Sequence, residues 1–356
     1  MLSIGDHDVK TAPEILDAMM ASARGGNLGY TSIQGSRALR QAVADRVTRT
    51  RKIGAAPGNI MITSGGQGAI FSSMMALLDP GQSCIVLDPY YASFDVTVRA
   101  ASGVPIIVPT QASEGFQPDP DAIADAVRDD TRAILINTPN NPSGAVYEPA
   151  RLEAIAEICR SRDLWLISDE LYDGQVFSGT HVSPRDLPGM VERTVVIGSM
   201  SKGYAMTGAR IGWAVAPEEL VERMVDLAGA TTYGLPGFLQ DASSFALTEL
   251  ADQERIVAER YLCRRNIAVE TIEGSNLLRI SPPSGGMYVM LDVRATGLTG
   301  VEFATRLLDD EKIAVMPGES FGKAAAGHVR IALTVPDDEL REAMLTMLGF
   351  ADRLAA

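Results

Sequence analysis

Short apolar segments alternate with helix-length amphipathic segments from about residue 60 onward. The apolar segments are rich in Ile and Val and are apolar on both faces, which is typical of strands buried in a parallel sheet. They cover residues 60–63, 84–87, 105–108, 133–137, 164–168, 194–198 and 211–216. Helical spacing separates them at 68–78, 119–128 and 148–162. The pattern predicts an α/β fold with a mostly parallel seven-stranded sheet between helices.

The pattern changes after about residue 236. Residues 237–273 keep helical spacing almost without a break, so we expect one long helix that links two lobes. Beyond it the sequence predicts a Pro/Gly turn at 281–286, strands at 287–292 and 328–333, and helices at 300–311 and 337–356. These elements predict a smaller α+β domain. We place the large domain at residues 25–255 and the small domain at residues 1–24 and 256–356, with the N-terminal segment packed on the small domain.

Composition narrows the class of protein. Lys and Arg number 31 against 45 Asp and Glu, a net charge of −14, which disfavours nucleic acid and acidic membrane surfaces as partners. The three cysteines and three histidines are widely spaced, which argues against a disulfide framework and a metal site. The start lacks the basic end and apolar run of a secretory signal, and no apolar stretch approaches the length of about 20 residues that spans a bilayer. We expect a cytoplasmic globular protein.

The sequence around one lysine predicts a buried, nucleophilic amine. Lys202 follows a predicted buried strand and lies among small residues. Burial lowers the pKa of a lysine and yields a neutral amine that attacks carbonyl groups. Ser199, three residues earlier, and Arg210, eight residues later, are suited to bind a phosphate. The alternative interpretation is a solvated lysine in a glycine-rich loop.

Polar residues also follow three other predicted strands. Asn141 lies in the turn 137–144, which has two prolines and a glycine, and such turns at the carboxyl end of a sheet bind ligands. Asp169 ends a strand, and its half-buried carboxylate needs a cationic partner, with Tyr172 three residues on. The glycine-rich segment 63–68 is suited to phosphate, but it has neither G-x-G-x-x-G nor a Walker lysine. A plain turn and a helix-capping Asp are the alternatives at Asn141 and Asp169.

Arg330 lies inside the predicted apolar strand 328–333. A buried guanidinium needs an anion, because burying an unpaired charge is costly. Either a structural ion pair or a substrate carboxylate meets that need.

In this order and spacing, the motifs resemble those of the fold-type I pyridoxal-phosphate enzymes. The chain is similar, from Gly5 to beyond Arg330, to the class I/II aminotransferases of the aspartate aminotransferase superfamily. The shared motifs are N-P-x-G at Asn141, D-x-x-Y at Asp169, S-x-S-K ending at Lys202, and the arginine that follows eight residues later. The resemblance implies pyridoxal 5′-phosphate as cofactor.

The resemblance also implies roles for single residues. Lys202 matches the lysine that forms the internal aldimine, Asp169 the carboxylate that pairs with the pyridinium nitrogen, and Tyr172 a donor to the phenolic oxygen. Asn141 matches the second such donor and also contacts substrate. The phosphate cup falls at Gly65, Gly66, Gln67, Ser199 and Arg210. The catalytic residues implied are Lys202, Asp169 and Tyr172.

Three further positions follow from the same resemblance. Tyr91 matches the aromatic side chain that stacks on the cofactor ring. Tyr30 matches the tyrosine that reaches the phosphate of the neighbouring subunit, which implies a homodimer. Arg330 matches the arginine that binds the substrate α-carboxylate, with the backbone near Gly5 closing over it.

The implied activity is transfer of an amino group between an L-amino acid and a 2-oxo acid by a ping-pong mechanism. A C–S β-lyase or a decarboxylase on the same scaffold remains an alternative, because such enzymes share every cofactor contact. A non-catalytic sensor fused to a DNA-binding head is disfavoured by the charge of −14. Gln67 stands where some aspartate-specific relatives carry a lysine, which weakens the case for aspartate. The substrate pair stays open.

Overall fold

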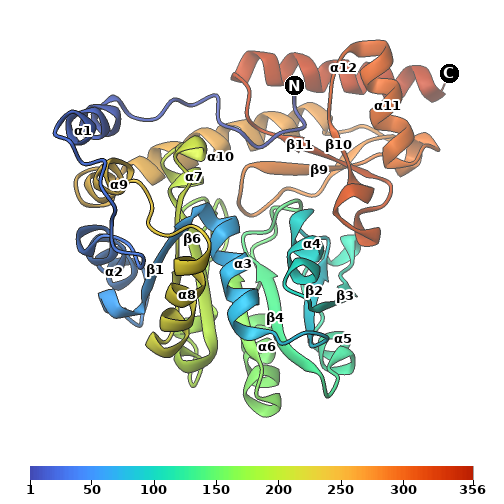
Figure 1. Ribbon diagram of the computed structural model, residues 1–356. Coiled ribbons are helices and arrows are strands. Elements are labelled where there is room, and N and C mark those ends of the chain that lie inside the picture. Colours follow the sequence, from blue (N-terminus) through green and yellow to red (C-terminus); the bar gives the residue numbers. More distant parts are fainter. Residues whose placement is uncertain (356) are drawn as a thin grey trace.

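The computed structural model describes residues 1–355 and places a large sheet below a small one (Figure 1). The large sheet has the strand order β1-β7-β6-β5-β4-β2-β3. All neighbouring strands are parallel except β7, which is antiparallel to β1 and β6. The predicted mostly parallel seven-stranded sheet is confirmed. Its strands are β1 (Ile60–Ser64), β2 (Ser83–Asp88), β3 (Val104–Pro109), β4 (Thr131–Asn137), β5 (Trp165–Asp169), β6 (Thr194–Ser199) and β7 (Ile211–Val215).

Helices cover both faces of this sheet, which explains why its strands are apolar throughout. Val86 and Leu135 pack into one core with residues of α3, α4 and α8, whereas Ile85 and Ile134 pack into another with residues of α6. Successive strand residues point to opposite faces, so a strand covered twice reads as a continuous apolar run. The helices of this part are α2 (Arg37–Thr50), α3 (Gly65–Leu77), α4 (Ser93–Ala100), α5 (Pro120–Ala126), α6 (Pro149–Arg162), α7 (Met200–Gly203), α8 (Glu218–Ala230) and α9 (Gly237–Glu249).

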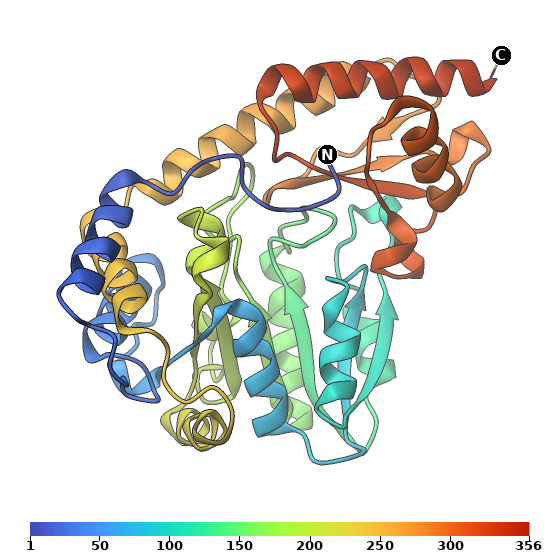
Figure 2. The same cartoon turned by 45° about the horizontal axis from the view of Figure 1, so that its top comes forward.

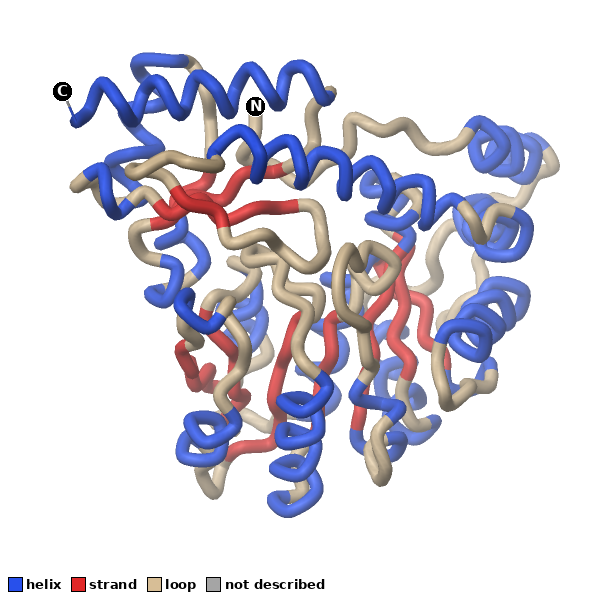
Figure 3. Tube along the Cα trace, turned by 180° about the vertical axis from the view of Figure 1, so that it is seen from behind, coloured by secondary structure: helices blue, strands red, loops and turns tan. Residues whose placement is uncertain are grey.

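The small sheet is antiparallel, with the order β10-β11-β9-β8. Seen from behind, α10 and α12 run side by side next to it (Figure 3). Met344 and Met347 of α12 pack against Val329 and Ile331 in one core. The elements are α10 (Gln253–Ile272), β8 (Arg279–Ile280), β9 (Tyr288–Asp292), α11 (Gly300–Glu311), β10 (Met316–Pro317), β11 (His328–Ala332) and α12 (Asp337–Ala355). The last residue of the predicted C-terminal helix lies outside the described residues.

The single long helix predicted over residues 237–273 is wrong. The structure has α9 and α10, separated at residues 250–252. Ala242 and Ala246 of α9 pack into the core beside β1 and β7, whereas Val257 and Tyr261 of α10 pack into the core of the small sheet. Each helix therefore needs its own axis, although the helical spacing continues through the break. Figure 2 shows α10 reaching from the α9 side to the small sheet.

The N-terminal segment divides between the two parts of the molecule. Leu2 packs into the core of the small sheet, as expected. The helix α1 (Pro13–Arg24) instead packs on α9, and its Ile15 is buried beside Leu39 of α2. The expectation that residues 1–24 pack together on the small domain is therefore wrong for α1. The amphipathic pattern of α1 marks a buried face but not which core covers it.

Within residues 1–355, no helix combines the length and the apolarity required to cross a lipid bilayer. The three cysteines are free thiols, and Cys84 and Cys159 are buried.

Candidate active site

A cavity of about 580 Å³ lies at the carboxyl edge of the large sheet, between the two sheets and the N-terminal segment. Its walls include Asn137 and Asp169, which end β4 and β5, together with residues of the small sheet and residues 3–6. The carboxyl edge of a parallel sheet is where α/β folds bind ligands. Ten predicted site residues line this cavity: Gly5, Gly66, Gln67, Tyr91, Asn141, Asp169, Tyr172, Lys202, Arg210 and Arg330.

Lys202 lies on α7, the single helical turn that follows β6. The Ser199 hydroxyl caps this turn by accepting a hydrogen bond of 3.0 Å from the Ser201 backbone N–H. Lys202 Nζ donates a hydrogen bond of 2.7 Å to the carbonyl oxygen of Gly5. Burial, helped by the positive charges of Arg330 and Arg210, lowers the pKa of Lys202 to about 8. Such an amine loses its proton much closer to neutral pH than a solvated lysine does.

Asp169 ends β5 and is only 5% exposed. Its Oδ1 accepts a hydrogen bond of 3.2 Å from the Leu171 backbone N–H. Residues 171–174 form a turn rather than a helix, so Asp169 does not cap a helix. Burial, together with the negative charge of Glu170, raises the pKa of Asp169 to about 7. In the described chain no cationic side chain lies within ion-pair distance of this carboxylate. A cationic ligand group would therefore stabilise its ionised form.

Asn141 and Tyr172 lie beside the small sheet. The Asn141 backbone N–H donates to Asn137 Oδ1 over 2.7 Å, which fixes the turn. Asn141 Oδ1 accepts a hydrogen bond of 2.8 Å from Arg330 Nη1, so the amide nitrogen of Asn141 remains a donor. The Tyr172 hydroxyl is buried and lies 3.5 Å from the Tyr288 hydroxyl.

Arg330 is a buried cation without a protein counter-ion. It is 5% exposed, and no carboxylate of residues 1–355 lies within ion-pair distance of it. Its guanidinium carbon lies 4.2 Å from the ring centre of Tyr288 and 4.5 Å from that of Phe321, and Nη2 donates to Ser3 O over 2.7 Å. Nε has no hydrogen-bond partner in the same residues. The described residues therefore do not form the structural ion pair considered at this position, and the buried guanidinium is suited to an anionic ligand.

The glycine-rich segment meets Arg210 at the other wall. Gly65 has φ +70°, and a Cβ atom there would lie 2.3 Å from Arg210 Nη2, so glycine is what lets the guanidinium approach. The Gln67 side-chain amide is hydrogen-bonded to two residues of α4. Its nitrogen donates to Thr97 Oγ1 and its oxygen accepts from Ser93 Oγ, both over 2.7 Å.

Gly65 and Ser199 do not line the cavity directly. The Ser199 hydroxyl lies 2.9 Å from Ser201 Oγ and 3.1 Å from Ile211 O. Ser201 lines the cavity instead. Its place in the S-x-S-K motif is the signal that identifies it.

The two predicted aromatic residues lie in different places. Tyr91 lines the cavity and is 41% exposed. Tyr30 is 93% exposed, contacts Tyr233 edge to face with ring centres 5.2 Å apart, and lines a separate cavity of about 490 Å³. Tyr30 is therefore not part of the cavity that this single chain forms.

Tyr288 is another site residue that the sequence analysis missed. It starts β9, lies over the guanidinium of Arg330 and next to Tyr172, and approaches Gly5 so closely that a Cβ atom there would be 1.8 Å from the Tyr288 hydroxyl. As one residue of an apolar strand it carries no local signal.

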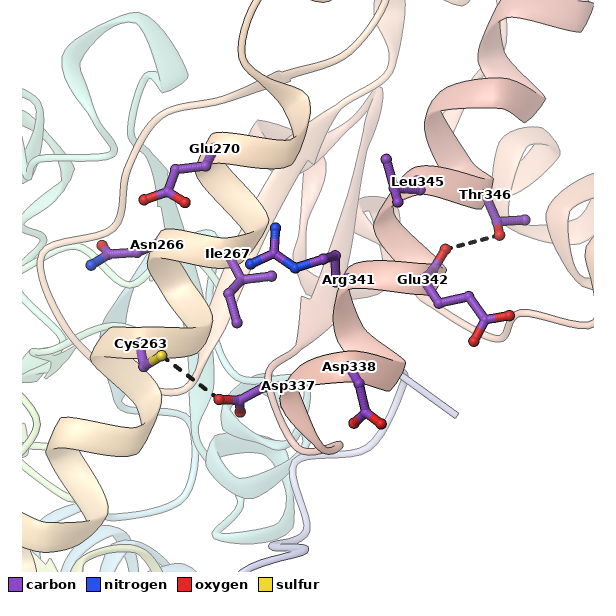
Figure 4. A pocket seen from close by; sticks show the side chains of 10 residues that line it. All are labelled: Cys263, Asn266, Ile267, Glu270, Asp337, Asp338, Arg341, Glu342, Leu345 and Thr346. Atoms are coloured by element: carbon purple, nitrogen blue, oxygen red, sulfur yellow. Dashed lines mark hydrogen bonds between the residues drawn. The ribbon is translucent and has the colours of Figure 1, made fainter.

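A larger cavity of about 820 Å³ lies between α10 and α12 (Figure 4). Its lining combines Cys263 with the carboxylates of Glu270, Asp337, Asp338 and Glu342. The predicted site residues all lie elsewhere, so size alone does not identify the active site.

A model of the family described as aminotransferase class I and II matches residues 1–346. The chain belongs to this family. An arginine–pyruvate transaminase of Pseudomonas aeruginosa is 40% identical over 343 residues, covering 96% of this chain and 87% of that protein. An aspartate/prephenate aminotransferase of Thermus thermophilus is 35% identical, covering 96% and 88%. A solved aromatic aminotransferase of Pyrococcus horikoshii has a TM-score of 0.96 at 32% identity, covering 99% and 95%.

These relatives agree on the chemistry and on the fold. The protein is a transaminase with the fold of the type I pyridoxal-phosphate enzymes, as predicted. The comparisons favour transamination over the β-lyase and decarboxylase alternatives.

Proposed function

We propose that this transaminase binds pyridoxal 5′-phosphate in the 580 Å³ cavity, and that Lys202 is the residue to which the cofactor becomes attached. Aminotransferases of this family depend on that cofactor. The observation that carries the proposal is that two buried charges without protein counter-ions, Asp169 and Arg330, share one cavity with the buried amine of Lys202.

The residues present fit the cofactor group by group. Asp169 is suited to the protonated pyridinium nitrogen, since that cation supplies the partner the carboxylate lacks. The free amide nitrogen of Asn141 and the hydroxyl of Tyr172 are suited to the phenolic oxygen. Tyr91 lines the same cavity and is suited to stack on the ring. When bound, the cofactor supplies the electron sink for the carbanion at the substrate Cα atom.

The phosphate group fits the wall formed by the start of α3 and by Arg210. Gly65, Gly66 and Gln67 form the first turn of α3, where unpaired backbone N–H groups favour an anion. Arg210 adds a guanidinium fork, and the hydroxyl groups of Ser199 and Ser201 add polar groups.

Lys202 has the proton chemistry that amino-group transfer needs. Its lowered pKa makes the neutral amine accessible near neutral pH, and an amine in that state takes a proton from a carbon acid and returns it as an ammonium. In the described structure Nζ is held by Gly5 O, so this hydrogen bond has to break before the amine acts.

Arg330 is proposed to bind the α-carboxylate of an L-amino acid and, in the second half-reaction, of a 2-oxo acid. Its fork is already oriented by Asn141 Oδ1 and Ser3 O, and an oriented fork binds a carboxylate through two hydrogen bonds. The two substrates then use the same arginine in turn, as a ping-pong mechanism requires.

The substrate pair is proposed only by class. The Gln67 amide is neutral and is held by Ser93 and Thr97, so it brings no positive charge for a distal carboxylate. This favours amino donors without a side-chain carboxylate. Because a 40% identical relative is named as an arginine–pyruvate transaminase, arginine with pyruvate is the first pair to assay, followed by aromatic donors and aspartate.

We also propose that the enzyme works as a cytoplasmic homodimer in which Tyr30 completes the neighbouring site. The 93% exposure of Tyr30, next to the 71% exposed Leu28, supports a second copy of the chain as the partner. The free buried thiols of Cys84 and Cys159 are compatible with a reducing compartment.

Borohydride reduction of the cofactor-loaded protein, followed by peptide mass mapping, tests the attachment. The chain has five lysines, so the adduct on Lys202 is easily distinguished from one on Lys10, Lys52, Lys312 or Lys323. We expect the label on Lys202 and no reducible adduct in the Lys202→Ala variant. A label on another lysine, or none at saturating cofactor, overturns the proposal.

A further inference from the structure

Five charged side chains with little exposure connect α2, the turn after β5 and α10, next to the segments that carry the proposed catalytic residues. Arg46 belongs to α2, Arg51 follows it, Glu170 and Asp173 lie in the turn after β5, and Glu254 lies in the first turn of α10. Their side chains are between 1% and 19% exposed. We call these five residues the buried charge network.

Arg46 is the centre of the network. Its guanidinium donates two hydrogen bonds to Asp173, of 2.9 and 3.1 Å, and two to Glu254, of 2.8 and 3.3 Å. The planar fork of arginine fixes the angle between these two carboxylates, which a single point charge does not do. Arg51 connects the remaining members by donating to Asp173 and, over 2.9 Å, to Glu170.

Glu170 is fully satisfied inside the protein. Besides Arg51, it accepts hydrogen bonds from Ser168 Oγ at 2.9 Å and Ser183 Oγ at 2.7 Å, and it lies 3.0 Å from His181 Nε2. A buried carboxylate with this many partners has one favourable position and loses much if it leaves that position.

Three members of the network adjoin the three proposed catalytic residues. Glu170 follows Asp169, and Asp173 follows Tyr172. Glu254 packs on Gly203, the residue after Lys202, where a Cβ atom would lie 2.8 Å from Glu254 Cγ. The network therefore links the backbone on which Asp169 and Tyr172 stand to the helical turn on which Lys202 stands.

A contribution to stability is a poor explanation for this arrangement. The desolvation of buried ion pairs offsets most of their Coulomb attraction, so such pairs add little net stability. What the bidentate contacts do provide is a fixed geometry, and displacements of about 1 Å at reacting groups change rates by up to about 100-fold.

We propose that the buried charge network is a positioning unit, which holds Asp169, Tyr172 and Lys202 in the mutual arrangement that the cofactor requires. The inference rests on the proposed function of these three residues. The members of the network are positioning residues, because they act through the residues next to them and do not line the cavity.

Arg46→Lys is the sharpest test, since it keeps the charge and removes the fork. The matched control is Arg255→Lys on α10, because Arg255 forms an exposed ion pair with Glu259 at 2.6 Å. For Arg46→Lys we expect kcat to fall about tenfold while KM for the amino acid stays within about twofold. We also expect the pH midpoint of the visible absorbance of the pyridoxal-phosphate-loaded enzyme to shift by at least about half a pH unit. The control should change neither.

Glu254→Gln is the second variant, and its control is Glu259→Gln in the same helix. If Arg46→Lys does not fold, Glu254→Gln tests the positioning proposal in its place. Glu254 has the most exposed side chain of the network, at 19%, so its replacement is the mildest. We expect the same fall in kcat and the same kind of shift in the absorbance midpoint.

Two results separate the possible failures. If the variants lower the unfolding midpoint but leave kcat and the absorbance midpoint at the values of their controls, the network is only structural and the positioning proposal is overturned. If the unaltered protein shows no reducible adduct on Lys202, the proposed function fails first, and the positioning proposal falls with it.

Discussion

Arg330 Nη1 donates a hydrogen bond of 2.8 Å to Oδ1 of Asn141, and this contact joins the small sheet to the turn after β4. The two residues are 189 positions apart in the chain. The contact uses the oxygen of the amide, which leaves the Asn141 nitrogen as a donor, and it also orients one arm of the guanidinium. A single hydrogen bond thus prepares both the proposed cofactor contact and the proposed substrate contact.

Replacement of Arg330 should weaken substrate capture. Arg330→Ala removes both arms of the fork, and charge-assisted hydrogen bonds of this kind account for a rise in KM of about 100-fold. Arg330→Lys keeps the charge and should cost about tenfold. Steady-state kinetics measure KM, and equilibrium dialysis should show that the dissociation constant of pyridoxal phosphate changes far less than KM does. Unaltered substrate affinity in Arg330→Ala would remove this residue from the site.

Lys202→Ala should abolish turnover while the protein stays folded. The loss of the amine removes both the attachment point and the proton carrier, and general acid–base catalysis alone accounts for a fall in kcat of about 100- to 10,000-fold. Circular dichroism checks the fold. The control is Lys52→Ala, whose side chain is exposed, and it should keep full activity. Near-normal transamination by Lys202→Ala would show that another residue does this chemistry.

Gly65→Ala should weaken cofactor binding through Arg210. Both Gly65 and Gly81 have positive φ, of +70° and +87°, but an added Cβ meets Arg210 at position 65 and nothing within 4 Å at position 81. Each alanine strains the backbone by about 1–2 kcal/mol, so Gly81→Ala is the control for that strain. Only Gly65→Ala should raise the dissociation constant of pyridoxal phosphate, by about tenfold. Equal cofactor affinity in the two variants would contradict the role of Arg210.

Asp169 should make the cofactor-free protein less stable as the pH rises. Its pKa is about 7 in the folded protein and 3.8 in the reference state, so between these values the folded state binds more protons than the unfolded state. The free energy of unfolding therefore falls with rising pH through this window. Asp169→Asn removes the titrating group. Urea unfolding at about pH 4.5 and about pH 7.5 should show a smaller loss in the variant, and equal losses would mean that the carboxylate is not destabilised by burial.

The sequence predicted the large sheet well because burial leaves a strong local mark. Ile85 and Val86 are consecutive, face opposite helix layers and are both apolar, so the strand is visible without its neighbours. The break between α9 and α10 left no such mark, because Ala246 and Val257 keep helical spacing although they belong to different cores. Which core covers an apolar face is a tertiary property.

The residues of the candidate site likewise fall into those that the sequence predicts and those that only the tertiary structure reveals. Asp169 and Lys202 are visible in the sequence because Asp169 ends one predicted strand and Lys202 lies just past another, and the carboxyl ends of parallel strands meet at one edge of a sheet. Tyr288 was missed because its importance depends on the approach of Gly5, from the other end of the chain, and of Arg330 on the adjacent strand. Neither contact has a signal within the segment around Tyr288.

Lys202 and Arg330 both hold the N-terminal segment by its carbonyl oxygens, those of Gly5 and Ser3. Exchanging the side chain of Ser3 leaves that acceptor in place, so an alanine scan will understate how much these residues matter. At Ser3 and Gly5, which line the cavity, the main chain therefore makes contacts that no side-chain substitution removes. Chemical replacement of single amides by esters, which weakens a carbonyl as an acceptor, is the way to reveal its contribution.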